Sequence, residues 1–225
     1  EWRRPIRRAS ELTTVFILMF GVGSVLIDLG RPDRMLYAIR YANFQSPLLW
    51  DVCSIATYLT VSSISLYLAL IPDIAMLRDL GGKREWFYRI LSLGWTGAQD
   101  QHHRLDKAIG FVSVLVIPVM ITVHTVVSFV FAMTIQPLWH SAIFGPYFVV
   151  GAIFSGVASV IVVMAVLRKA YHLESYIKPI HFNNIGIFLM AMTLLWFYFT
   201  FAENITIVYG NDPVHMSIFW SKMRI

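Results

Sequence analysis

Five long apolar segments alternate with charged stretches along the chain. The first runs over 12–27 (LTTVFILMFGVGSVLI), and the others cover about 52–72, 108–135, 142–167 and 185–209. A helix rises about 1.5 Å per residue, so roughly 20 apolar residues cross the hydrocarbon core of a bilayer, which is roughly 30 Å thick. Each segment is therefore long enough, or nearly so, to cross a membrane.

These segments are predicted to be helices because backbone N–H and C=O groups inside lipid can bond only with one another. The alternation over about ten residues that marks a membrane-barrel strand is missing from them. We therefore expect an all-α integral membrane helical bundle that forms a single membrane domain over 1–225. Its five transmembrane helices should lie at about 12–30, 48–72, 107–135, 142–168 and 185–209.

The composition agrees with a membrane protein. The chain is 57% hydrophobic and only 14% charged, whereas a soluble domain has about 25% charged residues. The lipid bilayer is thus an expected partner, and nucleic acid is not. Cys53 is the single cysteine, which excludes an internal disulfide and any cysteine-ligated cluster held by this chain alone.

The distribution of Lys and Arg predicts the orientation. The N-terminus and the segments 73–107 and 168–184 together hold 13 of the 18 basic residues. Because cytoplasmic loops are enriched in Lys and Arg, this side is placed in the cytoplasm and the C-terminus outside. No signal peptide is visible, since the first apolar run is followed by Asp-Leu-Gly-Arg and not by a small-residue cleavage site.

The predicted cytoplasmic loop, 73–106, is too long for a plain turn. Its stretch REWFYRILSLGW, residues 84–95, mixes charged and aromatic side chains. Such a stretch forms either an interfacial helix at the level of the lipid headgroups or a solvated loop with an aromatic belt. The sequence leaves both readings open.

Ionisable residues of separate segments fall in the outer half of the predicted bundle. They are Asp28, Asp51, His124, His140 and Glu203. An ionisable group within a span is costly, about 2.5–3.5 kcal/mol for Asp at a helix centre, so it usually faces a cavity or a partner. Simpler roles stay open: the two aspartates as helix caps, His124 as a core histidine, His140 as an interfacial residue, and Glu203 as the partner of a group outside this chain.

A histidine and a carboxylate in an apolar slot near one membrane face suit the oxidation of a quinol, which releases two protons with its two electrons. A neutral imidazole can accept one proton and a carboxylate the other. A haem held by two histidines needs both at depth on facing helices, and only His124 is deep. We therefore expect no haem, iron–sulfur cluster or metal site in this chain, so the electrons must pass to another subunit.

Several motifs, in order along nearly the whole chain, resemble the NrfD family. This family comprises the membrane subunits of polysulfide reductase, alternative complex III and related quinone-linked complexes. The motifs are WRRPIRRASEL (2–12), IDLGRPDR (27–34), SPLLWDV (46–52), LIPDIAMLRD (70–79), LSLGWTG (91–97), HTVVSF (124–129), PLWHSAIFGPYFVVGAIFSG (137–156) and LRKAYHLE (167–174).

The resemblance implies a haem-free helical subunit that binds a quinone, either menaquinone or ubiquinone, near the periplasmic face. It also implies an iron–sulfur subunit as partner, often with a cytochrome c subunit and other membrane subunits. The family motifs match at Asp51 and His124, which become the expected proton-accepting pair. A secondary set, for the quinone pocket or proton path, comprises Asp28, His140, Tyr147 and Glu203.

The family reading predicts a multi-pass subunit of the bacterial or archaeal cytoplasmic (inner) membrane. In a respiratory oxidoreductase complex it would oxidise quinol, release protons, and pass electrons to an iron–sulfur or cytochrome subunit, without activity alone. Family members have about eight to ten spans, so these five are expected to be part of a longer protein. DLGRPDR (28–34) is closer to the sulfite-reductase-associated and hydrogenase-associated branches, and PLLWDV (47–52) to alternative complex III.

Two other functions use the same features. A proton or ion channel or transporter would employ the same acidic and imidazole groups, but it would favour inverted repeats and polar groups near the midplane. The sequence contains no internal repeat, and its ionisable residues gather toward one face. A structural membrane anchor would keep full turnover after loss of Asp51 and His124.

The predicted orientation can be tested by cysteine labelling. A cysteine at Asn43 should react with an impermeant reagent from the periplasm, and one at Gly82 should not, because the positive-inside rule places Gly82 in the cytoplasm. The parent chain, with Cys53 as its single cysteine, is the control. Opposite labelling would move the expected site to the cytoplasmic face.

Overall fold

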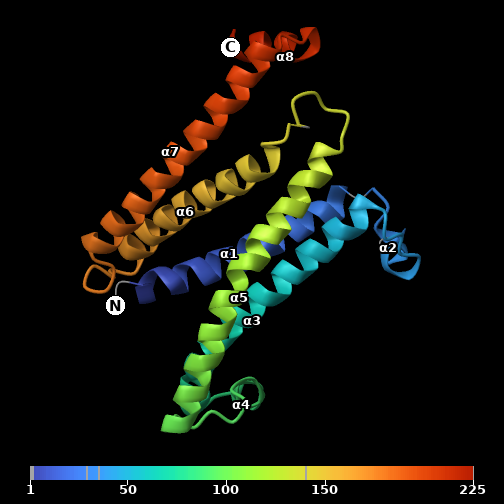
Figure 1. Cartoon of the computed structure of the whole chain (residues 1–225). Helices are drawn as coiled ribbons and strands as arrows, with labels where there is room; N and C mark the ends of the chain where they lie inside the picture. The colour runs from blue at the N-terminus through green and yellow to red at the C-terminus, as the bar shows by residue number, and fades with distance from the viewer. Residues whose placement is uncertain (1–2, 29, 35, 140, 225) are drawn as a thin grey trace. The chain divides into compact units, whose positions relative to one another are not determined.

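The computed structural model describes residues 3–28, 30–34, 36–139 and 141–224, with the side chains of 3–5, 28, 32, 38 and 39 left out, and these residues form helices joined by turns and loops (Figure 1). The long helices are α1 (Arg3–Asp28), α3 (Pro47–Asp79), α5 (Gln99–Ala132), α6 (Phe144–Ala170) and α7 (Pro179–Gly210). The shorter elements are a 3₁₀ turn at Pro32–Arg34, α2 (Tyr37–Arg40), α4 (Glu85–Leu91) and α8 (Pro213–Met223).

The prediction of an all-α protein with five membrane-spanning helices is confirmed. The five long helices are each long and apolar enough to cross a membrane. They extend beyond the predicted apolar stretches, most clearly in α5, which begins at Gln99 where the prediction began at about 107. The side chain of Gln101 accepts a hydrogen bond from the Thr96 backbone N–H at 2.8 Å, so polar residues continue the helix past its apolar segment.

By its internal contacts the chain divides into two compact units. The first unit contains residues 1–9, 33–54 and 121–225, and the second contains 10–32 and 55–120. The boundaries fall inside α1, α3 and α5. A single membrane domain over 1–225 stays a prediction.

The centre of the first unit is the hairpin of α6 and α7, which lie side by side (Figure 1). Gly151 of α6 has no side chain, so the Trp196 indole of α7 comes close to it: a Cβ there would lie 3.3 Å from Trp196 Nε1. The same indole stacks on Phe154, with ring centroids 5.9 Å apart, and contacts Tyr147 at 5.8 Å. Tyr147, Gly151 and Phe154 recur every three to four residues, so they share one face of α6.

A small apolar core joins the ends of α6 and α7 that are linked by residues 171–178. Met164 is fully buried, and Ala9 and Ile177 are nearly so. Lys178 precedes α7, and its backbone N–H donates to Nδ1 of the buried His181 at 2.8 Å. This end of the hairpin is therefore closed by packing and by a cap in which the His181 side chain satisfies an N–H group.

At the other end of the hairpin, α7 stops at Gly210 and α8 begins at Pro213. Asn211 has the left-handed conformation, φ 48°, which asparagine tolerates after a helix. Asp212 then accepts a hydrogen bond from the His215 backbone N–H at 3.4 Å, and Pro213 takes the first helical position, where no N–H is needed. The sequence Asn-Asp-Pro thus ends one helix and starts the next.

The second unit contains polar contacts between α3 and its neighbours. Ser65 of α3 donates to Oε1 of Glu11 on α1 at 3.2 Å. Sequence reasoning placed Glu11 before the first span, whereas the apolar part of α1, Ile6–Ile27, includes it. Further along α3, the Tyr67 hydroxyl donates to the backbone carbonyl of Leu91 at 2.6 Å, which ties the end of α4 to α3.

The close contact at Gly151 predicts a stability effect. Replacement of Gly151 by leucine should destabilise the protein by about 1–3 kcal/mol, because the added atoms overpack the Trp196 contact. The measurement is thermal unfolding of the purified protein in detergent. Gly156→Leu is the matched control on the same helix, since a Cβ at Gly156 meets no atom within 4 Å; equal unfolding temperatures for the two variants would contradict the packing described.

Candidate functional site

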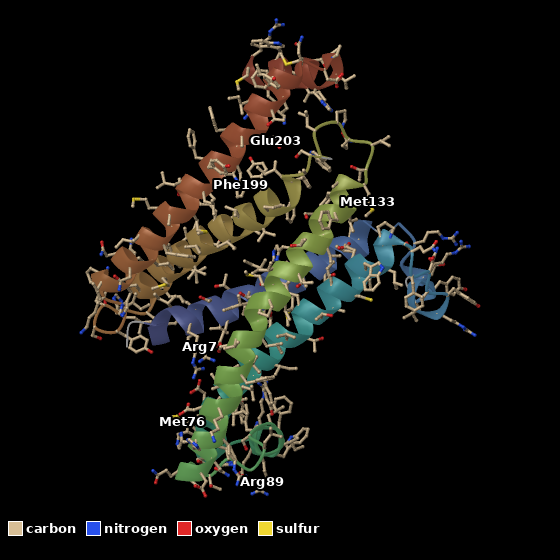
Figure 2. All side chains as sticks on the ribbon, viewed as in Figure 1. Arg7, Met76, Arg89, Met133, Phe199 and Glu203 are labelled. Atoms are coloured by element: carbon tan, nitrogen blue, oxygen red, sulfur yellow. The ribbon has the colours of Figure 1, made fainter. Side chains whose placement is uncertain are left out.

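Glu203 is the carboxylate around which the best-defined polar site of the first unit is built. It lies on α7 about 10 Å from the end of the helix at Gly210, one turn after Phe199 (Figure 2). It is half-buried, and its Oε2 accepts a hydrogen bond from the Ser141 hydroxyl at 2.9 Å. Its Oε1 accepts no hydrogen bond from the part of the chain that the structure describes.

A second polar contact lies one turn earlier on α7. The Tyr147 hydroxyl is 3.0 Å from the Thr200 hydroxyl, and the Thr200 hydroxyl donates to the Trp196 carbonyl at 2.9 Å. Thr200 has only one hydroxyl hydrogen. Because Trp196 takes that hydrogen, Tyr147 must be the donor to Thr200, and the Tyr147 oxygen is left as an acceptor.

Two cavities meet at Glu203. The larger one, of about 400 Å³, lies between the segment before α6, the end of α7 and the start of α8. The smaller one, of about 260 Å³, lies toward Tyr147, Thr200 and Lys222. Both are lined by Leu138, Glu203 and Ile207. A ligand in either cavity could therefore reach the same carboxylate.

The walls of these cavities are mostly apolar. The larger one is lined by Leu138, Ala142, Ile143, Ala202 and Ile207, and the smaller one adds Trp139, Phe144 and Phe219. Leu138 has φ 74°, a left-handed conformation that costs a residue with a Cβ about 1–2 kcal/mol. Few polar groups in an apolar cavity of several hundred Å³ are typical of sites for small organic ligands.

The start of α8 adds polar groups to the larger cavity. His215 and Asp212 both line it, and His215 Nδ1 lies 3.2 Å from Asp212 Oδ2. This pair was missed from the sequence, although Asp-Pro is a signal for the start of a helix. Among the described residues no group of three or more His, Cys, Asp or Glu side chains could hold a metal ion.

Asp51, the expected carboxylate of the proton-accepting pair, lies in the first turns of α3. The residue is half-buried. Its Oδ1 is buried and has no hydrogen-bond partner in the described chain. A buried oxygen without a partner is costly, so this atom is suited to a donor from a ligand or from another part of the protein.

His124, the expected imidazole, is half-buried on α5, about 12 Å from the end of that helix at Ala132. It lies one turn before Ser128, on the same face. Ser128 is buried at the contact with α6, where a Cβ on Gly145 would be 3.5 Å from its hydroxyl oxygen. His124 therefore lies one turn below the contact between α5 and α6.

The structure brings together two of the residues predicted from the sequence, Tyr147 and Glu203, which both line the smaller cavity. Neither Asp51 nor His124 lines either of these two cavities. The Asp28 side chain and His140 lie outside the described residues. The pairing of Asp51 with His124 stays a prediction.

Several polar partners in this site were missed from the sequence. Ser141, Thr200 and Asn204 all belong to it, since Asn204 donates to the Thr200 carbonyl at 2.8 Å and lines the smaller cavity. A signal was available for two of them: Glu203 and Asn204 lie three and four residues after Thr200 in a largely apolar span, which places each of them near Thr200 on the helix surface.

Comparison with known proteins gives a family match over nearly the whole chain. Residues 3–223 match the family model described as polysulphide reductase, NrfD. Over 141 residues the chain is 28% identical to a Halobacterium salinarum protein described as a membrane subunit of dimethyl sulfoxide reductase; the match covers 62% of this chain and 30% of that protein.

A second relative, from Mesobacillus selenatarsenatis, is described as a subunit of selenate reductase. It is 26% identical over 164 residues, which covers 68% of this chain and 38% of the relative. The matched part is thus about a third of the length of each of these curated relatives.

The hydroxyl contact in this site predicts a measurable loss of stability. Tyr147→Phe should lower the free energy of unfolding by about 1 kcal/mol, because it removes the bond to Thr200 but keeps the ring that contacts Trp196. Thermal unfolding of the purified protein measures this. Tyr209→Phe, at a position that is 92% exposed, is the control; an equal effect of the two variants would count against a specific bond at Tyr147.

Proposed function

Because the chain belongs to the NrfD polysulphide reductase family, we propose that it is the quinol-oxidising membrane subunit of a respiratory oxidoreductase complex. The five helices able to span a membrane make it a multi-pass membrane protein. Its similarity to membrane subunits of reductases supports a role in electron transport. The quinol, the periplasmic location of the site and the direction of electron flow are parts of the proposal.

One observation carries the proposal: an apolar cavity of about 400 Å³ contains a carboxylate that has an oxygen open to a further donor. The cavity has the size of a site for a small organic molecule. A quinol ring has the apolar surface that such walls require and hydroxyl groups that can donate to Glu203 Oε1. Tyr147, whose oxygen is an acceptor, lies at the adjoining cavity.

The directions of the helices support the proposal that the four site residues lie at a similar depth in the membrane. Asp51 and Tyr147 lie near the starts of α3 and α6, whereas His124 and Glu203 lie within about 12 Å of the ends of α5 and α7. If successive spans cross the bilayer in opposite directions, all four lie near the same membrane face. The excess of Lys and Arg on the other side of the predicted spans supports the proposal that this is the periplasmic face.

In the proposed reaction a bound quinol supplies two electrons and two protons on oxidation. The proposed proton acceptors are a ring nitrogen of His124 and Oδ1 of Asp51, the buried oxygen without a partner. Neither residue lines the cavity at Glu203, so in this proposal the protons pass from the quinol to them through intervening groups. Glu203, with Ser141, orients a hydroxyl group through the hydrogen bond open at Oε1. The apolar walls exclude water from the ring. The electrons leave to an iron–sulfur or cytochrome subunit, which this chain needs as a partner.

The remaining parts of the proposal follow the family reading. The quinone is menaquinone or ubiquinone, and the complex lies in a bacterial or archaeal cytoplasmic membrane. The sequence assigned this chain no haem or iron–sulfur cluster, so electron transfer beyond the quinol depends on the partner subunits. Further spans of a longer protein would complete the bundle around the exposed faces of the five helices.

The proposal predicts the effect of removing the proton acceptors. In the assembled complex, His124→Ala and Asp51→Asn should each lower quinol-dependent electron transfer by about a hundredfold or more, the usual contribution of a general base. The measurement is anaerobic quinol oxidation by the complex in detergent or liposomes. Activity with an artificial electron donor or acceptor that reacts directly with the partner subunits should not change.

Matched controls are available on the same chain. His103→Ala and Asp106→Asn change exposed residues near the start of α5 and should keep the parental rate. Normal quinol oxidation by assembled His124→Ala and Asp51→Asn complexes would contradict the proposed roles and favour a structural anchor. Proton flux through the complex in liposomes, without quinol oxidation, would instead favour a channel or transporter.

A further inference from the structure

The short helix α4 (Glu85–Leu91) and its flanks present an apolar surface that no other part of the second unit covers. Four large side chains form it: Trp86, Phe87, Ile90 and Leu93, with exposed fractions of 66%, 46%, 64% and 69%. Trp86 and Ile90 are four residues apart, so they share one side of α4, and Leu93 follows two residues after the helix ends. We call these four residues the α4 apolar face.

The structure holds α4 in a fixed orientation, which is why this face is presented outward. The Tyr67 hydroxyl of α3 donates to the Leu91 carbonyl at 2.6 Å. Arg78, also of α3, donates to the hydroxyl of the fully buried Ser92 at 3.2 Å. Both contacts lie at the end of α4 and bind its inner side to α3, so the apolar face is turned away from α3.

The backbone after α4 also favours this presentation. Leu93 has φ 48°, a left-handed conformation that a leucine rarely adopts, and Gly94 follows with φ 70°. A non-glycine residue persists in such a conformation only where its surroundings impose it. Here the strained turn leaves the Leu93 side chain mostly exposed beside Ile90, although a leucine in water gains nothing from that exposure.

Basic side chains border the apolar face. Lys83 and Arg84 precede α4, and Arg89 lies in its last turn; all three are exposed. Arg89 projects outward from α4 (Figure 2) and pairs loosely with Glu85 at 3.5 Å. No ion pair within the described chain engages Lys83 or Arg84. The segment between Gly82 and Gly94 therefore has an excess of positive charge beside exposed Trp, Phe, Ile and Leu.

The position of α4 along the chain decides what can cover this face. The segment leaves α3 after Asp79 and enters α5 at Gln99, and α4 lies beside these two helix ends (Figure 1). Both helices are able to span a membrane, so α4 is held at the level of the membrane surface. At that level tryptophan and basic residues are the preferred contacts with headgroups, and apolar side chains reach the acyl chains.

We infer that the α4 apolar face is a docking surface for the anionic lipid leaflet on the side of the 73–107 segment, with Trp86, Ile90 and Leu93 inserted below the headgroups and Lys83 and Arg84 on lipid phosphates. The charge complementarity between these two basic residues and anionic phospholipids selects a lipid leaflet as the occupant. The inference is independent of quinol oxidation, because it concerns a different unit and a different readout.

The test is a depth measurement in the assembled complex. Cys53, the single cysteine, is replaced by serine, and nitroxide labels are attached to Trp86→Cys, Ile90→Cys and Leu93→Cys. Glu85→Cys and Arg89→Cys are the matched controls on the charged side of the same helix. The complex is placed in nanodiscs of phosphatidylcholine with or without phosphatidylglycerol, and collisions with oxygen and with a water-soluble nickel chelate are measured.

The three labels on the apolar face should be reached by oxygen and shielded from the nickel chelate, several-fold more than the labels at 85 and 89. Lys83→Gln with Arg84→Gln should reduce this shielding in nanodiscs with phosphatidylglycerol and leave it unchanged in phosphatidylcholine alone. Free access of the nickel chelate to all five labels would overturn the inference in favour of a solvated loop. Exclusion of both reagents would overturn it in favour of a covering protein.

Discussion

The fold depends on one constraint: hydrocarbon offers the backbone no hydrogen-bond partners, so each span must bond within itself. Hydroxyl side chains in these helices follow the same rule. Thr60, Thr125 and Thr206 each donate to the backbone carbonyl four residues earlier, at 2.7 Å. Each of these hydroxyl groups donates within its own helix, so it needs no acceptor on a neighbouring helix. Polar groups that cannot bond within their own helix form contacts between helices, as does a hydroxyl oxygen that accepts a further hydrogen bond, like that of Thr200.

Carboxylates are such groups, and they lie at the polar contacts between helices in both units. Glu203 accepts a hydrogen bond from Ser141 in the loop before α6, and Glu11 accepts one from Ser65 of α3. Within the first unit, α6 and α7 also pack through a small residue and an aromatic ring, Gly151 and Trp196. Without a hydrophobic force to join helices in lipid, small residues and hydrogen bonds are what hold them together. The same contacts that join α6 and α7 thus create the polar patch in an apolar cavity.

The existence and type of the long helices could be predicted from the sequence because hydropathy indicates which segments are apolar enough to lie in lipid. The helix ends could not, since they are set by backbone capping. Gln101 bonded to the Thr96 N–H starts α5 earlier than its apolar run, and Asn211 in the left-handed conformation ends α7. In the same way, α1 begins at Arg3, so Glu11 lies within the helix although it precedes the apolar run at 12–27.

The site was predictable in depth but not in rotation about the helix axes. Position along a span follows from residue number, which is why Tyr147 and Glu203 were expected near one face and do line one cavity. Their partners, Ser141 and Thr200, are separated from them by 62 and 53 residues, and no periodicity links such distant positions. For Asp51 and His124 the structure gives their positions along α3 and α5, and both their shared depth and their convergence stay predictions.

The direction of the hydroxyl chain at Tyr147 has a consequence for redox selectivity. The Tyr147 hydroxyl donates its hydrogen to Thr200. Toward a bound ligand, the Tyr147 oxygen can therefore only accept a hydrogen bond, and the same is true of the Glu203 carboxylate. At these two groups a ring with hydroxyl substituents gains hydrogen bonds that a ring with carbonyl substituents cannot make. Under the proposed function, this pair would favour binding of the quinol, and its contacts to the ring would be lost once the quinol has given up its hydrogens.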